Sequence, residues 1–454
     1  MSEERPQLSV ALQKAPLMQA LARGGSPGYA WRHFFKEMTD PTNHARRRLH
    51  HAFVVLAMIV LVVLSALGLG RFGYGIVLPA MQDSLKLTNV QAGELQTWNL
   101  AGYLIAAVSA GVLAVRFGPR LVISISALIV AVSLVLTGLA PDASHARWAR
   151  GLTGLGAGGV NVPAMGLVPA WFAARRRGTA AGIAVAGSSL GLMITGPLVP
   201  FIISLKGPDQ GWRACWHVFG GMALAIALLA MAFLRNRPSE LGLRPVGDDS
   251  PGPGGGLPPA SSLDWKLVWR APALWHLAAI YFCFGLSYAI YTTFFVRYLV
   301  KECEFTQAAA SAVWFQMGVG SAVSGLIWGV ASDRWGRRAA LLAVFAIQAA
   351  SFSTFGLFHS APGAYCSAFL FSITAWSIPG IMAAVCGDRF GARAAPAALG
   401  LVTVVFGIGQ AIAPLLAGAI ADATRSFSLA FVLAGLVALA GAGGSLVLKA
   451  QRPA

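Results

Sequence analysis

Arg71 is the residue of this sequence best suited to bind a charged ligand, because it lies deep in the apolar run of residues 52–80 with no acidic neighbour in sequence. A charge near the centre of a bilayer costs at least ~2.5–3.5 kcal/mol, so it normally faces water or a ligand. Tyr74 follows on the same helix face, and nearby glycines leave room for a ligand. We expect both residues to bind an anion, which a guanidinium can hold through two hydrogen bonds. An arginine bound only to backbone carbonyls is the alternative.

A second intramembrane cation, Arg150, opens the segment RGLTGLGAGG. Helical spacing places it on one face with Gly154, Gly158 and Asn161. Such a cation either lines a cavity, where it binds substrate or takes part in ion coupling, or extends outward from the helix end toward the membrane surface. We expect Arg150 and Asn161 to line the substrate site.

Neutral polar and aromatic side chains complete the candidate site. Asn99 and Tyr103 have the spacing of one helix face. Each such residue alone is more often a packing residue than a ligand. An arginine surrounded by tyrosines and amides favours an anion over a cation. The other candidates are Tyr288, Tyr291, Trp376 and Gln410.

The composition requires a lipid environment for these residues. Of 454 residues, 56% are hydrophobic and only 11% are charged, far from the averages of soluble proteins. The net charge of +17 comes largely from arginines in short gaps between apolar runs, so it indicates membrane topology and not nucleic-acid binding. The five cysteines lack the spacing of zinc ligands or of a disulfide framework, and we expect no metal and no cofactor.

Apolar runs long enough to cross ~30 Å of hydrocarbon occur twelve times, six before and six after a polar segment rich in Pro and Gly. They lie near residues 52–80, 92–114, 121–140, 148–170, 178–203, 214–234, 272–299, 308–331, 339–358, 363–386, 396–420 and 427–448. The predicted domains are an N-terminal arm (1–50), a six-helix bundle (51–234), a flexible linker (235–271), a second six-helix bundle (272–448) and a tail (449–454).

The distribution of arginine predicts the orientation. Alternate gaps contain arginine clusters, and the intervening gaps contain acidic residues such as Asp83 and Glu302. The positive-inside rule then places both termini and the linker in the cytoplasm, with the protein in a bacterial inner membrane. Within the arm, residues 29–38 combine aromatics and cations; they predict either a short helix on the membrane surface or a disordered arm.

The two halves repeat one another. GVLAVRFGPR begins at Gly111 and GVASDRWGRR at Gly329, and the same offset along the chain also pairs Gly182 with Gly400. Such duplication predicts two bundles with a substrate site between them at the midplane of the membrane.

GVASDRWGRR resembles the cytoplasmic signature of the major facilitator superfamily. The resemblance implies an all-α membrane protein with twelve transmembrane helices in two pseudo-symmetric six-helix bundles, and a latch that holds the inner side shut. Val115 replaces the signature aspartate in the first half, which removes that part of the latch there. The implied gating residues are Gly329, Asp333, Arg334, Gly336, Arg337 and Arg338 in the second half and Gly111, Arg116, Gly118 and Arg120 in the first.

Two further resemblances concern the subfamily. GLGRFGYGIVLPAM, WNLAGYLIAA and GQAIAPLLAGAIADATRSF resemble YbfB-type bacterial carriers, whereas residues 171–245 resemble monocarboxylate porters and oxalate exchangers. These likenesses imply a monomeric secondary transporter that moves a small organic anion, such as a carboxylate, together with a proton or a counter-solute. A proton-coupled exporter of drugs or metabolites is the second hypothesis. A membrane-embedded enzyme or receptor is the third, but the sequence shows no metal cluster, no activated nucleophile and no soluble output domain.

Overall fold

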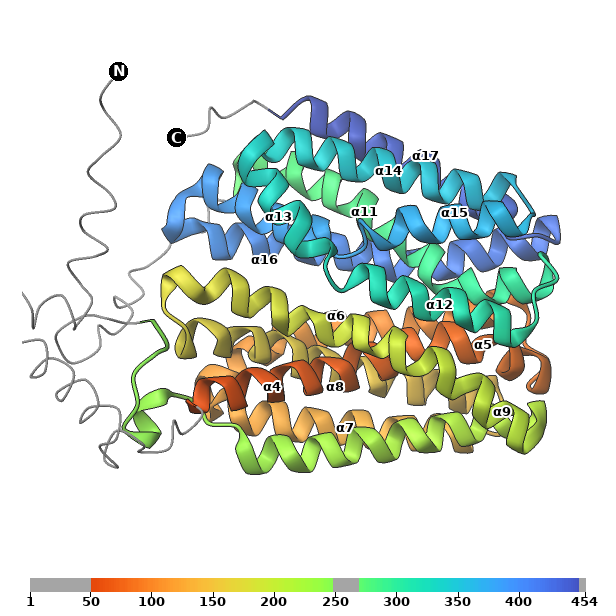
Figure 1. The fold of residues 1–454 in the computed structure, drawn as a ribbon, viewed down its shortest axis with the longest axis horizontal. Helices are drawn as coiled ribbons and strands as arrows, with labels where there is room; N and C mark the ends of the chain where they lie inside the picture. The colour runs from red at the N-terminus through yellow and green to blue at the C-terminus, as the bar shows by residue number, and fades with distance from the viewer. Residues whose placement is uncertain (1–49, 248–268, 449–454) are drawn as a thin grey trace, which may run out of the picture. The chain divides into compact units, whose positions relative to one another are not determined.

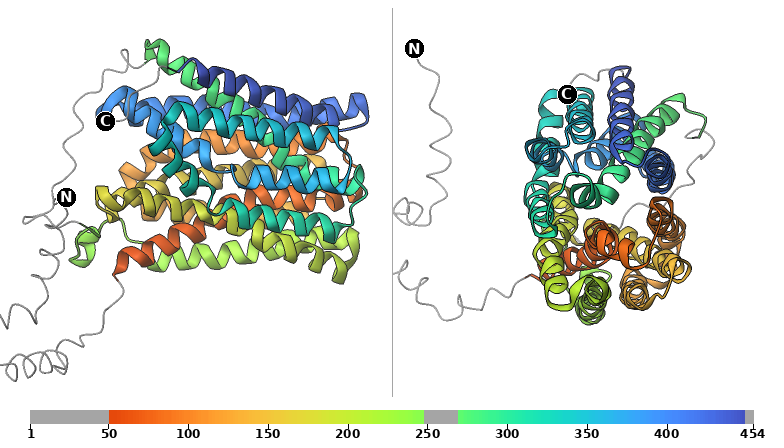
Figure 2. Two further views of the ribbon diagram at one scale, coloured as in Figure 1. Left: turned by 45° about the horizontal axis from the view of Figure 1, so that its top comes forward. Right: turned by 90° about the vertical axis from the view of Figure 1, so that its right-hand side faces the viewer.

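The computed structural model describes residues 50–247 and 269–448, and residues from Val54 onward form one compact unit. This unit is built of helices that run side by side (Figure 1). Seen end-on in the right-hand view of Figure 2, the helices coloured red to light green lie on one side and those coloured green to blue on the other. The predicted N-terminal arm with residues 29–38, most of the linker and the tail lie outside the described residues.

The first half contains α4 (His51–Val63), η1 (Leu64–Phe72), α5 (Gly73–Ser84), α6 (Asn89–Phe117), α7 (Pro119–Leu139), α8 (Ala143–Trp171) and α9 (Ala174–Phe233). The second half contains α11 (Pro272–Lys301), α12 (Gln307–Ser321), α13 (Ser324–Trp335), α14 (Arg337–Leu357), α15 (Ala361–Ser372), α16 (Ser377–Thr424) and α17 (Ser428–Leu446).

Twelve membrane crossings account for these helices, which confirms the predicted fold class. Ten stretches are long and apolar enough to span a bilayer. One of them, within α9, is broken at Gly207 and supplies two crossings. The less apolar α8, 29 residues long, supplies the remaining one and packs against α6 and α7.

Three of the crossings are irregular, which the apolar runs did not predict. The first contains the π-helical stretch η1 between α4 and α5. The eighth is interrupted between α12 and α13, and the tenth between α15 and α16. Interrupted transmembrane helices are typical of binding sites near the midplane, and π-helical turns often occur at functional sites.

The loops after α6 and α13 repeat one another in conformation. Gly118 has φ 86° and ψ 141°, and Gly336, its equivalent in the second half, has φ 88° and ψ 151°. Both lie in the region of positive φ that only glycine adopts without strain. The signature glycine at this position is therefore required by the turn, and the repeat inferred from the sequence extends to the backbone.

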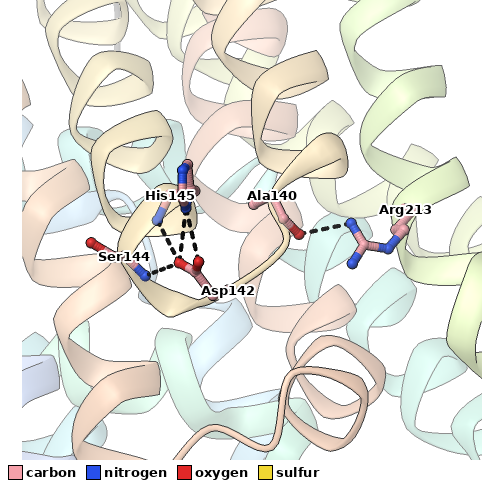
Figure 3. Close-up of polar contacts among 5 residues, drawn as sticks. All are labelled: Ala140, Asp142, Ser144, His145 and Arg213. Atoms are coloured by element: carbon pink, nitrogen blue, oxygen red, sulfur yellow. Dashed lines mark hydrogen bonds and ion pairs between the residues drawn. The ribbon is translucent and has the colours of Figure 1, made fainter.

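Loop contacts fix the start of α8 and the end of α7 (Figure 3). Asp142 caps α8 by accepting hydrogen bonds from the Ser144 and His145 amides, and its hydrogen bonds with His145 lower the pKa of its carboxyl group. Arg213 donates to the carbonyls of Gly138 and Ala140 at the end of α7. Since α8 carries Arg150 and Asn161, this cap helps to fix where both side chains lie.

The linker begins later than predicted. Residues 235–247 are ordered and include the short 3-10 helix η2 (Pro238–Leu241). Val246 forms a bridge with Phe172 after α8, and the Asn236 side chain accepts a hydrogen bond from the Arg120 amide. These residues, which the sequence assigned to the flexible linker, make hydrogen bonds with one another and with the first half.

Candidate functional site

Arg71 is a buried cation with unsatisfied donors. It lies in η1, is 6% exposed, and its guanidinium carbon stands 4.3 Å from the centroid of the Tyr103 ring. Its Nε and Nη2 atoms have no hydrogen-bond partner among the residues that the structure describes. Buried donors without partners are costly, and a charged group raises that cost. A negatively charged ligand that accepts from both atoms would remove it.

Both halves contribute to the surroundings of Arg71. Asn161 on α8 donates to the Tyr103 hydroxyl on α6 across 2.8 Å. From the second half, the Tyr288 hydroxyl on α11 interacts with Arg71 and with Gln410 on α16. Gln410 is buried, and its Nε2 donor also has no partner in the described part of the chain. Arg71, Tyr103, Asn161, Tyr288 and Gln410 are called the Arg71 cluster below.

Trp376 borders this cluster where α16 begins. Its ring lies 5.2 Å from that of Phe72 and 6.3 Å from that of Tyr288. Its indole nitrogen donates to the Ser189 hydroxyl across 2.9 Å, and that hydroxyl also pairs with Ser321. Trp376 therefore connects the break in the tenth crossing to α9 and to the residue after Arg71.

An aromatic stack that sequence reasoning missed stands beside Tyr288. Tyr281 stacks on Phe406 at 4.3 Å, and Phe284 stacks on Tyr288 at 5.0 Å and on Phe406 at 5.5 Å. The spacing of 281, 284 and 288 along one face of α11 was the available signal. The stack offers an apolar surface next to a cationic group, which suits an anion with an apolar or planar body.

Arg150 lies inside the protein and does not extend outward. It is 0% exposed, its Nη1 donates to the Gly70 carbonyl across 2.6 Å, and its Nη2 donates to Gln96 Oε1 across 2.9 Å. Asn99, predicted as a ligand, donates to the Arg150 carbonyl. Arg150 therefore binds the backbone of η1 directly before Arg71, and Asn99 binds the backbone of α8 at Arg150.

Two predicted tyrosines lie outside the Arg71 cluster. The Tyr74 hydroxyl donates to the Ala92 carbonyl across 2.6 Å, and the Tyr74 ring faces Arg150. The Tyr291 hydroxyl pairs with Ser367 across 2.7 Å, and its ring packs among phenylalanines. Because both hydroxyls bond to protein groups outside the Arg71 cluster, we leave Tyr74 and Tyr291 out of the proposed set of ligands.

The signature loop of the second half makes ion pairs within its own half. Arg337 pairs with Asp333, four residues earlier, and with Asp388 on α16. Val115, which stands at the position equivalent to Asp333, is 90% exposed. An added methyl group on Gly111 or Gly329 would meet nothing within 4 Å.

The opposite ends of the helices are joined across the two halves. We call them the Asp83 end, and the ends at the signature loops the Arg337 end. Asp83 pairs with Lys301, Arg297 donates to the Gln82 side chain across 2.8 Å, and the Asp422 carboxylate accepts from the amides of Asn89 and Val90 at the start of α6. A methyl group added to Gly93 would collide with the Pro414 carbonyl.

Comparison with known proteins identifies relatives over most of the chain. The profile of the family described as "Uncharacterised MFS-type transporter YbfB" matches residues 63–445. A probable sulfoacetate transporter, SauU, of Cupriavidus necator is 25% identical over 89% of this chain and 95% of its own length. The hexuronate transporter of Bacillus subtilis is 24% identical over 82% of this chain and 88% of its own length.

Solved structures share the fold. A bacterial homologue of the human lysosomal transporter Spinster, in an inward-facing and unoccupied conformation, superposes with a TM-score of 0.72, at 16% identity, over 90% of this chain and all of the other.

Proposed function

This chain belongs to the YbfB-type family of major facilitator transporters, and we propose that it is a secondary carrier that binds a small organic anion at Arg71. It is a membrane transporter and not an enzyme. The proposed ligands are the five residues of the Arg71 cluster, with Trp376 and the aromatic stack beside them.

The unpartnered Nε and Nη2 atoms of Arg71 carry this proposal. They are adjacent donors on one planar group, the geometry that a carboxylate or sulfonate accepts through two parallel hydrogen bonds. Gln410 Nε2 offers a further free donor from the other half. An anion bound between Arg71 and Gln410 would therefore touch both halves, as alternating access requires.

The names of the relatives support the same class of solute. Sulfoacetate and hexuronates are both small organic anions. They differ in shape, so the names favour the charge of the solute and not one compound.

The loop charges and the contacts between halves together suggest a transport state. If the arginine-rich loops face the cytoplasm, the Arg337 end is the inner one. Because the Asp83 end is closed, the structure then corresponds to an inward-facing carrier. Both termini lie in the cytoplasm of a bacterium in this proposal, and a proton or a counter-solute drives transport. We propose that the carrier works as a monomer in the lipid bilayer.

Calorimetry on the purified protein tests the role of Arg71. We expect binding of sulfoacetate or glucuronate by the wild type, weaker binding by Arg71→Lys, which keeps the charge but loses the planar fork, and no binding by Arg71→Ala. The control is Arg147→Ala, which removes a cation from α8 that pairs with Glu94. Equal affinity in the wild type, Arg71→Lys and Arg71→Ala would show that Arg71 is not a ligand.

A further inference from the structure

We propose that Arg150 is a positioning residue: with Gln96, it holds the π-helical stretch that presents Arg71, and it does not contact the transported anion. The inference rests on the proposed function only in taking Arg71 as the residue that binds the anion. It assigns to Arg150 a role different from the substrate binding or ion coupling that its sequence motif suggests.

The contacts of Arg150 are made with the protein on several sides. Nη1 donates to the carbonyl of Gly70, the residue before Arg71, and Nη2 donates to Gln96 on α6. The rings of Tyr74 and Trp216 lie 4.8 and 5.2 Å from its guanidinium carbon. Its Nε lacks a partner among the described residues, as in Arg71, but Arg150 is 0% exposed whereas Arg71 keeps 6%. A ligand can therefore reach the guanidinium of Arg71 more readily than that of Arg150.

The stretch that Arg150 holds determines where Arg71 points. Hydrogen bonds in η1 span five residues, as from the Gly73 amide to the Gly68 carbonyl. A turn of this kind holds more residues than an α-helical turn, so it changes the direction in which later side chains leave the helix. The carbonyl that Arg150 binds lies in this turn, directly before Arg71.

Close packing restricts the position of η1, and a polar contact adds to that restriction. A methyl group on Gly68 would lie 2.7 Å from Gly191 Cα on α9, and one on Gly70 would lie 3.2 Å from Thr153 Cγ2 on α8. These are van der Waals contacts that press η1 against α8 and α9, and they lack the directional restraint of a hydrogen bond. The hydrogen bond from Arg150 to Gly70 supplies that directional restraint.

The two acceptors of Arg150 require an arginine. The Gly70 carbonyl and the Gln96 side chain belong to different helices and bind different nitrogens of one planar group. A lysine ammonium on a flexible stem cannot reproduce this fixed fork. Gln96 precedes Thr97, which donates to the Ala411 carbonyl of the second half, so the same turn of α6 contacts both Arg150 and the other bundle.

Hydrogen–deuterium exchange tests the inference without any ligand. We expect the amides of residues 64–74 to exchange about tenfold faster in Gln96→Leu and in Arg150→Lys, and Gln96→Glu, which keeps the acceptor, to restore protection. Gln348→Leu is the matched control. Gln348 is also a buried glutamine, its Nε2 donates to the Thr374 carbonyl in the second half, and its loss should leave residues 64–74 unchanged.

Calorimetry with sulfoacetate and glucuronate on the same variants separates positioning from direct contact. We expect Gln96→Leu to lower the affinity about tenfold, because Arg71 is displaced, and Gln96→Glu to recover most of it. Unchanged exchange of residues 64–74 in both Gln96→Leu and Arg150→Lys would overturn the inference. If Arg71→Ala bound as well as the wild type, the proposed function would fail, but the exchange measurement would still decide whether Arg150 holds η1.

Discussion

Two buried donors of Arg71 stay free among the described residues, and the side chains that contact its guanidinium are neutral. Tyr103 and Tyr288 contact the guanidinium through a ring face and a hydroxyl, and neither neutralises its charge. A carboxylate at this place would compete with an anionic substrate, whereas tyrosines and amides leave the charge available. The free energy of binding the anion then includes removal of the cost of unsatisfied donors.

The Tyr288 hydroxyl should strengthen this site. In Tyr288→Phe the ring can still stack on Phe284 and face Trp376, but the hydroxyl beside Arg71 and Gln410 is lost. Tyr288 is one of the proposed ligands, and a hydrogen bond from its hydroxyl to a charged anion contributes about 1.5–3 kcal/mol, so we expect roughly a tenfold or greater loss of affinity for the bound anion. Calorimetry would measure it. Tyr291→Phe is the control, because the Tyr291 hydroxyl pairs with Ser367. Equal loss of affinity in the two variants would contradict a specific role of the Tyr288 hydroxyl.

At the scale of elements, the sequence predicted the apolar membrane crossings and missed the irregular turns within them. Each crossing needs a long and mostly apolar stretch, so all twelve were visible as hydropathy runs. The π-helical stretch and the interruptions in the eighth and tenth crossings leave hydropathy unchanged, because they change hydrogen bonding and not composition. The sequence motif identified the signature glycines but not the physical reason for each. Gly336 is required by positive φ, while Gly329 makes no close helix contact.

Of the proposed site, the sequence indicated Arg71 and the neutral residues of the Arg71 cluster, but it missed several neutral neighbours of that cluster. Arg71 stood out because a charge in lipid carries a large cost. Ser189 and Phe406 carry no such cost, so nothing separated them from the many serines and phenylalanines that only pack, and for Phe284 the only signal was its helical spacing from Tyr281 and Tyr288. Sequence also does not reveal a hydroxyl that is already bonded to a neighbour, as in Tyr74 and Tyr291.

The difference between the two signature glycines can be measured. Gly336→Ala places a side chain at φ 88°, which costs roughly 1–2 kcal/mol, so we expect a lower unfolding temperature. Gly329→Ala lies within α13 with open space around it, and alanine is favoured over glycine in a helix by about 0.5–1 kcal/mol. Thermal unfolding in detergent should therefore shift in opposite directions. Equal shifts would show that the loop conformation does not depend on Gly336.

At the scale of the whole transporter, α6 and α16 meet at one end and separate toward the other. At the Asp83 end, methyl groups on Gly93 and Gly418 would collide with the backbone of the opposite half. Gly111 follows Gly93 on α6, and Gly418 follows Gly400 on α16, at a spacing that is a whole number of helical turns, so each pair shares a helix face. Methyl groups on Gly111 and Gly400 would meet nothing within 4 Å. The same faces are in contact at one end and open at the other.

The symmetry of the halves explains where the closed end is fastened. Asp83 and Lys301 are separated by the same offset as Gly111 and Gly329, so their ion pair joins equivalent positions of the two bundles. Such a pair forms only where the pseudo-symmetric helix ends converge. If the bundles rock about the Arg71 cluster, this pair should break as Gly111 and Gly400 come into contact with the opposite half.

Substitutions at the two glycines of α6 should therefore bias the carrier in opposite directions. Gly93→Leu places a side chain against Pro414 and should open the Asp83 end. Gly111→Leu fits the present structure without collision but should prevent closure of the Arg337 end, which leaves the protein folded and slows exchange of sulfoacetate or glucuronate across liposomes. The measurement is the labelling rate of single cysteines introduced at each end, after replacement of the five free cysteines. We expect Gly93→Leu to raise labelling at the Asp83 end and Gly111→Leu to raise it at the Arg337 end. Labelling that moves in the same direction in both variants would mean that α6 does not alternate between these two contacts.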